Sequence, residues 1–253
     1  MSTWLEPRAR TAPSLSFPRL LGRFTLAGLF AGLLAAAWLL LVTEPTIRSA
    51  LVVEEARQAT GASRGHEELF SRTTQLVGGV LGTVLTGVVL AVVFATVYGT
   101  VRHRLPGRTD LARATLLAAI GFGIVGLLPA IIIPANPPGV GSPHTVSTRT
   151  AIYGAVLLCG VVITMLTAAL VSLLRDRGVG TAPTALAATV LAVALAGLVM
   201  ILMPDSPDPV PADFPASVVR NFRLASLGQL LVLWAGMGVA GGWLLDRSAQ
   251  RAD

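Results

Sequence analysis

Six long apolar runs alternate with polar segments along the chain. They lie at about residues 20–43, 76–101, 111–133, 150–174, 182–203 and 224–245. Each run is close to or longer than the ~20 residues with which an α-helix crosses the hydrocarbon core of a bilayer. The pattern therefore predicts an all-α, polytopic membrane bundle with six transmembrane helices.

Composition supports this prediction, because only 13% of the 253 residues are charged. A soluble domain carries about 25% charged residues. Residues 1–19 are polar and rich in proline, so we expect a disordered tail before a membrane domain at 20–247, with a short tail at 248–253. The first apolar run is too long for the core of a signal peptide and is interpreted as a retained span.

The arginines predict the orientation of the spans. The two tails and the second-to-third and fourth-to-fifth turns hold 12 of the 19 arginines, whereas the other three loops hold 7. Acidic residues divide the other way, with 5 on the first side and 8 on the second. The positive-inside rule then places both termini in the cytoplasm.

Three polar segments fall on the predicted outer side. Residues 44–58 have helical spacing, and we expect them to lie along the membrane surface. The segment 134–149, PANPPGVGSPHTVSTR, is broken by proline and glycine and cannot form a regular helix. The acidic segment from Pro204 to Pro215, PDSPDPVPADFP, is held extended by its prolines. We expect these segments to gather at one outer face.

Several kinds of chemistry have no signature in the chain. There is no phosphate-binding P-loop or H-E-x-x-H motif, and Cys159 is the single cysteine. The arginines do not form a basic stripe with aromatics, so nucleic acid is not an expected partner. No serine, histidine and aspartate arrangement stands out, and we predict that the chain is not an enzyme. Away from their ends the spans hold no Asp, Glu, His or Arg, which leaves mild polar groups as pathway candidates, chiefly Gln229, Thr83 and Thr164.

Ligand-type side chains are concentrated on the outer side. Carboxylate and imidazole groups together suit a divalent first-row metal. The candidate metal-binding residues are His144, Asn136, Glu44, Glu54, Glu55 and His66. Each also has a simpler interpretation, since loop carboxylates are usually solvated and Asn136 suits a turn before two prolines. Arg149, Arg220 and Arg223 begin or precede spans, so we expect acidic partners or lipid phosphate, with Arg223–Glu44 as one hypothetical pair.

Glycines spaced four residues apart occur in three of the spans. The pairs are Gly28 with Gly32, Gly78 with Gly82, and Gly238 with Gly242. Small residues at this spacing let two helix backbones approach closely. Such faces favour tight packing within the bundle and also permit a homo-oligomer.

Three stretches resemble the CbtA family, which is described as a predicted cobalt transporter subunit. They are ANPPGVGSPHTVSTRTAIY at 135–153, the E-P and E-E pattern of Glu44, Pro45, Glu54 and Glu55, and FPASVVRNFRLASLGQLLVLWAGMG at 214–238. The resemblance covers most of residues 20–247. It implies cobalt uptake across the bacterial inner (plasma) membrane, no permanently bound cofactor, and a one-span partner, CbtB, with a histidine-bearing end. Family descriptions count five spans, whereas the arginine alternation favours six.

The main hypothesis is therefore a permease subunit that gathers a divalent cation, cobalt, at its outer loops and passes it through the bundle. One alternative is a non-transporting membrane scaffold with a proline-rich outer binding surface. A second is a membrane enzyme acting on a lipid, for which no carboxylate pair at a span end supplies a metal-diphosphate site. Surrounding membrane lipid is an expected partner in every case.

Overall fold

The computed structural model describes residues 16–61 and 71–251, and within them every regular element is helical. The elements are α1 (Phe17–Trp38), η1 (Leu39–Thr43), α2 (Glu44–Ala59), α3 (Arg72–Val101), α4 (Asp110–Phe122), η2 (Gly123–Leu127), α5 (Leu128–Ile132), η3 (Pro143–Thr145), α6 (Val146–Asp176), α7 (Thr181–Leu202) and α8 (Ala216–Ala249). His66 lies outside the described residues.

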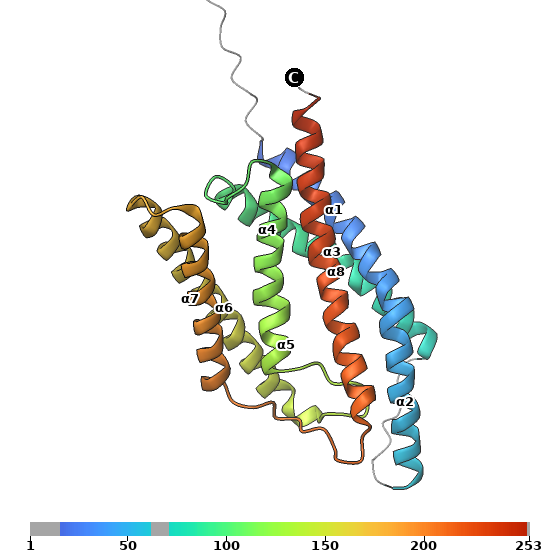
Figure 1. Cartoon of the computed structure of the whole chain (residues 1–253). Coiled ribbons are helices and arrows are strands. Elements are labelled where there is room, and N and C mark those ends of the chain that lie inside the picture. Colours follow the sequence, from blue (N-terminus) through green and yellow to red (C-terminus); the bar gives the residue numbers. More distant parts are fainter. Residues whose placement is uncertain (1–15, 62–70, 252–253) are drawn as a thin grey trace, which may run out of the picture.

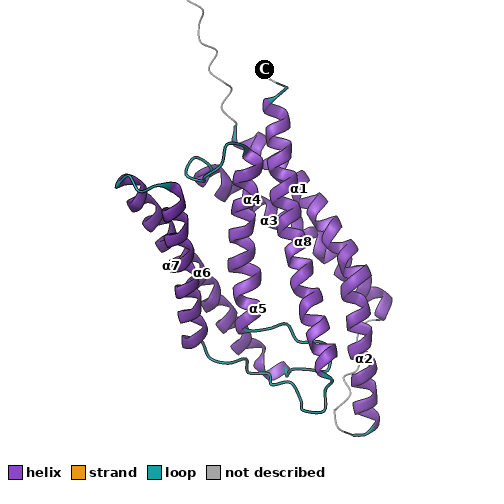
Figure 2. Cartoon of the chain, in the orientation of Figure 1, coloured by secondary structure: helices purple, strands orange, loops and turns teal. Residues whose placement is uncertain are grey.

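Six helical stretches in the described chain are long and apolar enough to cross a membrane, which confirms the predicted fold class. Helix α1 begins and α8 ends at the same end of the bundle, here called the termini end (Figures 1 and 2). The turns from α3 to α4 and from α6 to α7 lie at this end as well. The long loops at 133–145 and 203–215 lie at the opposite end, here called the cap end.

Four helices form the main body of the bundle. Helix α1 packs against α3 and α8, and α4 packs against the other side of α8. Aromatic side chains fill the junction, with the rings of Phe24 and Phe94 centred 4.9 Å apart and those of Phe24 and Tyr98 centred 5.2 Å apart. Helices α6 and α7 form a separate pair that meets this body through η2 and α5 (Figure 1).

Glycine permits a close crossing in the body, between α1 and α3. A Cβ atom added at Gly32 would lie 2.9 Å from the Cα atom of Val84, and one at Gly87 would lie 2.9 Å from the Cα atom of Gly32. Such separations leave no room for a side chain, so the backbones touch directly. Gly78 and Gly82, by contrast, have open space around them, so only some of the predicted glycine faces are used within the chain.

Both membrane π-helical segments end two residues before a proline. Segment η1 ends at Thr43 before Pro45, and η2 ends at Leu127 before Pro129. Proline has no N–H for the carbonyl four residues earlier, so the regular hydrogen-bond pattern cannot continue there. In the second case that carbonyl belongs to Val125, and the Tyr153 hydroxyl of α6 donates to it at 3.2 Å. The helix irregularity thus helps to attach the α6–α7 pair.

The first polar segment differs from expectation. Residues 44–59 do not form a separate helix along the membrane surface, because α2 continues directly from α1 through η1. The combined helix has 43 residues and is about 64 Å long at 1.5 Å per residue. That is about twice the ~30 Å hydrocarbon core, so α2 extends beyond the membrane. Helix α1 also begins at Phe17 and α8 at Ala216, both earlier than the apolar runs indicate.

Replacing Gly87 with alanine should destabilise the bundle. The new methyl group would meet the Gly28 carbonyl and the Gly32 backbone, and overpacking of this kind costs roughly 1–3 kcal/mol. Gly82→Ala on the same helix is the matched control, because its added Cβ meets nothing within 4 Å. Thermal unfolding in detergent should show a lower midpoint for Gly87→Ala alone. Equal midpoints for the two variants would contradict the direct backbone contact.

Candidate functional site

Three polar segments that are distant in sequence meet at the cap end. Helix α2, the loop at 133–145 and the loop at 203–215 contribute Ala50, Val140 and Phe214 to a small hydrophobic cluster, which Val219 of α8 completes. These three segments are here called the cap. Their contact agrees with the expectation that the polar segments gather at one face.

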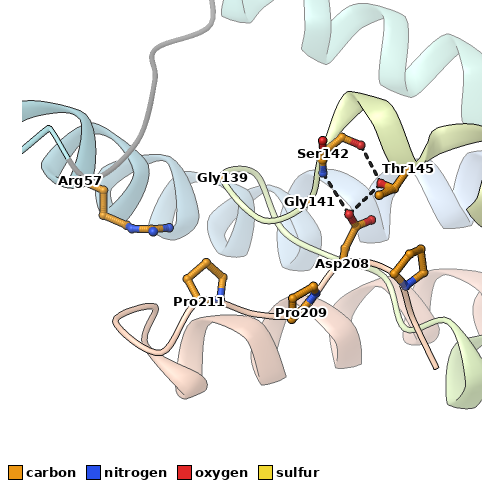
Figure 3. A pocket seen from close by; sticks show the side chains of 9 residues that line it. Arg57, Gly139, Gly141, Ser142, Thr145, Asp208, Pro209 and Pro211 are labelled. Atoms are coloured by element: carbon orange, nitrogen blue, oxygen red, sulfur yellow. Dashed lines mark hydrogen bonds between the residues drawn. The ribbon is translucent and has the colours of Figure 1, made fainter.

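The centre of the cap is the carboxylate of Asp208, which is 5% exposed as a residue. Its Oδ1 atom accepts hydrogen bonds from the Ser142 backbone N–H at 3.0 Å and from the Thr145 hydroxyl at 2.7 Å (Figure 3). The Arg149 guanidinium lies 3.1 Å from Oδ2. Asp208 therefore ties the loop at 203–215 to the start of α6. Arg149, predicted to need an acidic partner, has this one.

A cavity of about 290 Å³ opens beside Asp208. All three cap segments contribute to its walls. Helix α2 provides Arg57, the loop at 133–145 provides Gly139, Gly141, Ser142 and Thr145, and the loop at 203–215 provides Pro207, Asp208, Pro209 and Pro211. Figure 3 shows Arg57 and Asp208 on the two sides of this space. The Gly139 and Gly141 backbones have positive φ angles of 79° and 115°, which side chains disfavour, so glycine shapes this wall.

A second ion pair closes the far side of the cap. The Arg57 Nε atom lies 2.8 Å from Asp213 Oδ2, and the Arg57 guanidinium carbon lies 5.9 Å from the centre of the Phe214 ring. The Arg57 side chain is only 15% exposed. Arg57 therefore already interacts with the Asp213 carboxylate and the Phe214 ring.

Two of the predicted metal-binding residues instead interact with arginine side chains. Glu44 is 4% exposed and pairs with Arg48, at 2.9 Å, and with Arg72. The Asn136 Oδ1 atom accepts from Arg223 Nη2 at 3.1 Å. The hypothetical Arg223–Glu44 pair is therefore wrong, because each residue has other partners. Arg220 is exposed and has no hydrogen bond or ion pair among the described residues.

Three other predicted ligands, Glu54, Glu55 and His144, have no side-chain hydrogen bond or ion pair among the described residues. Glu54 lies against Gly139, where an added Cβ would be 3.1 Å from the Glu54 Cβ atom. Glu55 and His144 are exposed. In the part of the chain that the structure describes, no three His, Cys, Asp or Glu side chains are placed to hold one metal ion. Among the described residues, the cap thus presents single ligand groups rather than a ligand cluster.

A chain of polar groups runs from the cap into the bundle. Thr43 is 4% exposed, and its hydroxyl donates to Gln229 Oε1 at 3.1 Å. The Gln229 amide donates to the Thr83 hydroxyl at 3.3 Å, and that hydroxyl donates to the Gly79 carbonyl at 2.8 Å. Two pathway candidates, Gln229 and Thr83, are therefore in direct contact. Thr164 lies apart on α6, where its hydroxyl donates to the Gly160 carbonyl.

Sequence reasoning did not single out Asp208, Arg57 or Thr43 as site residues. Asp208 lies among three aspartates in one proline-rich segment, and nothing in the local pattern distinguishes the buried one. Asp205 is exposed, and the side chain of Asp213 is 55% exposed. A signal was available for Thr43, because it immediately precedes Glu44-Pro45 and the proline predicts a helix irregularity there.

Comparison with known proteins gives one family. The model of the CbtA family, described as "Probable cobalt transporter subunit (CbtA)", matches residues 17–246. No curated protein and no solved structure gives a significant match to the chain. The family match spans all six membrane helices and the cap.

Asp208→Asn should weaken the cap. Loss of the charge removes the ion pair with Arg149 and weakens two hydrogen bonds to a buried acceptor, at a cost of roughly 1–3 kcal/mol. The exposed Asp205 is the matched control, since Asp205→Asn removes the same charge three residues away. Limited proteolysis of the loop at 203–215 should be faster in Asp208→Asn. Equal cleavage of the two variants would show that Asp208 does not hold the loop.

Proposed function

We propose, from the premise that this chain belongs to the CbtA family of probable cobalt transporter subunits, that it is the permease subunit of a cobalt uptake system. It is a multi-pass protein of the bacterial inner membrane, with six membrane-spanning helices. The cation would be gathered at the cap and passed into the helical bundle. The arginine distribution predicts that the cap lies on the outer side.

The observation that carries this proposal is the meeting of three polar segments around one cavity. Ligand-type groups lie on or beside these segments, while the interiors of the spans carry no carboxylate or imidazole. A cation in uptake must first be concentrated at the mouth of its path, which fixed negative groups achieve through their field. The cap supplies such groups at one place.

The unpaired carboxylates are the best candidates for this first contact. Glu54 and Glu55 have no ion pair within the described residues, whereas Glu44, Asp208 and Asp213 are neutralised by arginines. Single carboxylates act on a hydrated cation mainly through charge, since they cannot replace a whole coordination shell. His144, exposed at the start of η3, adds a nitrogen ligand of the kind that first-row metals accept. His66 remains a candidate from the sequence.

We assign the route of the cation into the bundle to the chain of polar groups formed by Thr43, Gln229 and Thr83. Thr43, Gln229 and Thr83 come from three different helical segments, η1, α8 and α3. Oxygen atoms exchanged along such a chain can replace waters of a passing cation. The π-helical turn at η1 supports this role, because it places the irregular backbone at the same point.

A partner would complete the metal path. The family describes a subunit, and the described residues of this chain hold no three-ligand metal cluster. A one-span CbtB-type partner with a histidine-bearing end would supply the missing nitrogen ligands.

A scaffold role is the second candidate function. It is favoured by the exposed proline-rich loop at 203–215, since extended proline segments suit protein recognition. Purified protein in sealed vesicles separates the two functions. Accumulation of labelled cobalt, with the partner present, supports the permease. Its absence, in vesicles whose protein is folded by circular dichroism, supports the scaffold.

Glu54→Gln combined with His144→Ala should lower cobalt accumulation in cells several-fold. The change removes one unpaired charge and one nitrogen ligand from the cap without touching its ion pairs. Asp176→Asn at the termini end is the control for loss of a negative charge. Uptake of radioactive cobalt should be normalised to the amount of protein in the membrane. Normal uptake by the double variant would remove both residues from the mechanism.

Gln229→Leu should reduce the maximum rate of uptake more than the concentration of cobalt at half-maximal rate. The substitution removes the amide that links Thr43 and Thr83, below the site of first contact. Gln229→Glu is the informative comparison, because it keeps an oxygen ligand and adds charge. Initial rates measured over a range of cobalt concentrations test this. An effect confined to half-saturation would place Gln229 at the first binding step instead.

A further inference from the structure

An apolar groove runs along the lipid-facing side of the bundle between α1 and α8. It has a volume of about 710 Å³ and is lined mainly by Leu26, Phe30 and Leu34 of α1 and by Ala235, Val239 and Trp243 of α8. Its walls are almost entirely apolar. The groove is separate from the cap cavity, since none of its lining residues belongs to the cap.

The groove matches one leaflet of a bilayer in length. Its α8 wall extends from Val232 to Leu244, which is about 18 Å at 1.5 Å per residue. Half of the ~30 Å hydrocarbon core is about 15 Å. Trp243 is 48% exposed at the end nearer the chain termini, where an indole ring is typical of the interface with the headgroups.

Two arginines continue the walls of the groove at that end. Arg23 precedes Leu26 by three residues and Phe30 by seven, so it lies on the same face of α1. Arg247 follows Trp243 by four residues on α8, and its guanidinium carbon lies 4.9 Å from the centre of the Trp243 ring. Neither arginine has an ion pair or hydrogen bond among the described residues. This contrasts with Arg102 and Arg113 at the same end, which pair with Asp110.

We propose that this groove is a binding site for an anionic glycerophospholipid of the cytoplasmic leaflet. One acyl chain would lie along the apolar walls, and the phosphate would sit between Arg23 and Arg247. The charge complementarity selects this occupant, because an apolar helix would leave both guanidinium groups without a counter-charge. Basic groups beside a groove between membrane helices are the arrangement that binds acidic lipid headgroups. The inference is independent of which ion the bundle carries.

The test uses the full-length protein in a neutral detergent, with phosphatidylglycerol and phosphatidylcholine added in separate titrations. Lipid binding is followed by the midpoint of thermal unfolding and by native mass spectrometry. Phosphatidylglycerol should bind and raise the midpoint, whereas phosphatidylcholine should do so much less. Arg23→Gln with Arg247→Gln should weaken the apparent affinity for phosphatidylglycerol by about fivefold for each arginine, or roughly 30-fold together.

Two further variants separate this site from general attraction. Arg175→Gln with Arg177→Gln removes the same charge from the α6–α7 turn and should leave the affinity unchanged. Ala235→Phe fills the groove and should abolish the preference for phosphatidylglycerol, whereas Ala169→Phe on the exposed face of α6 should not.

Three results would overturn the proposal. Equal weakening by the two arginine pairs would reveal unspecific charge attraction. Equal binding of the two lipids would reduce the groove to ordinary annular contact. A change of oligomeric mass in Ala235→Phe, with lipid binding intact, would assign the groove to a second copy of the chain. Because no readout depends on transport, these failures are distinct from failure of the proposed function.

Discussion

The arrangement at the cap end depends on one buried carboxylate. Asp208 is only 5% exposed, so its charge is stabilised mainly by the Ser142 N–H, the Thr145 hydroxyl and the Arg149 guanidinium. These partners belong to the loop at 133–145 and the start of α6, while Asp208 belongs to the loop at 203–215. The requirement to satisfy one charge therefore fixes two otherwise irregular segments against each other. The small apolar cluster around Phe214 then joins them to α2.

Within the membrane-spanning helices a second constraint applies, because each backbone carbonyl needs a hydrogen-bond donor. Pro45 and Pro129 each remove an N–H, and a π-helical turn precedes each of them. At the second site, the Tyr153 hydroxyl of α6 donates to the Val125 carbonyl of η2. At the first site, Thr43 and Gln229 form a polar contact between η1 and α8. The irregularity at η2 thus lies where the α6–α7 pair attaches, and the one at η1 lies at the cap end of the polar chain.

The two ends of the molecule present different chemistry. At the cap end several carboxylates pair with arginines, whereas Glu54 and Glu55 have no ion pair among the described residues, and Glu54 lies against Gly139 of the cavity wall. At the termini end the chain concentrates arginines, and two of them, Arg23 and Arg247, have no acidic partner among the described residues beside the α1–α8 groove. A cation approaching one end and an acidic lipid at the other are the ligands that these charges suit. The uncharged interior between them makes a barrier that only the mild polar groups interrupt.

The sequence alone determined the six spans, because apolar runs of this length have no other stable environment than a bilayer. It also indicated that the Gly28–Gly32 face would carry a close crossing, and that the polar segments on one side would matter. It could not separate Asp208 from Asp205 and Asp213, nor assign Arg223 to Asn136, since these choices depend on contacts between residues far apart in the chain. The tertiary structure decided them, because burial removes water and makes each polar group take whichever partner the packing brings within reach.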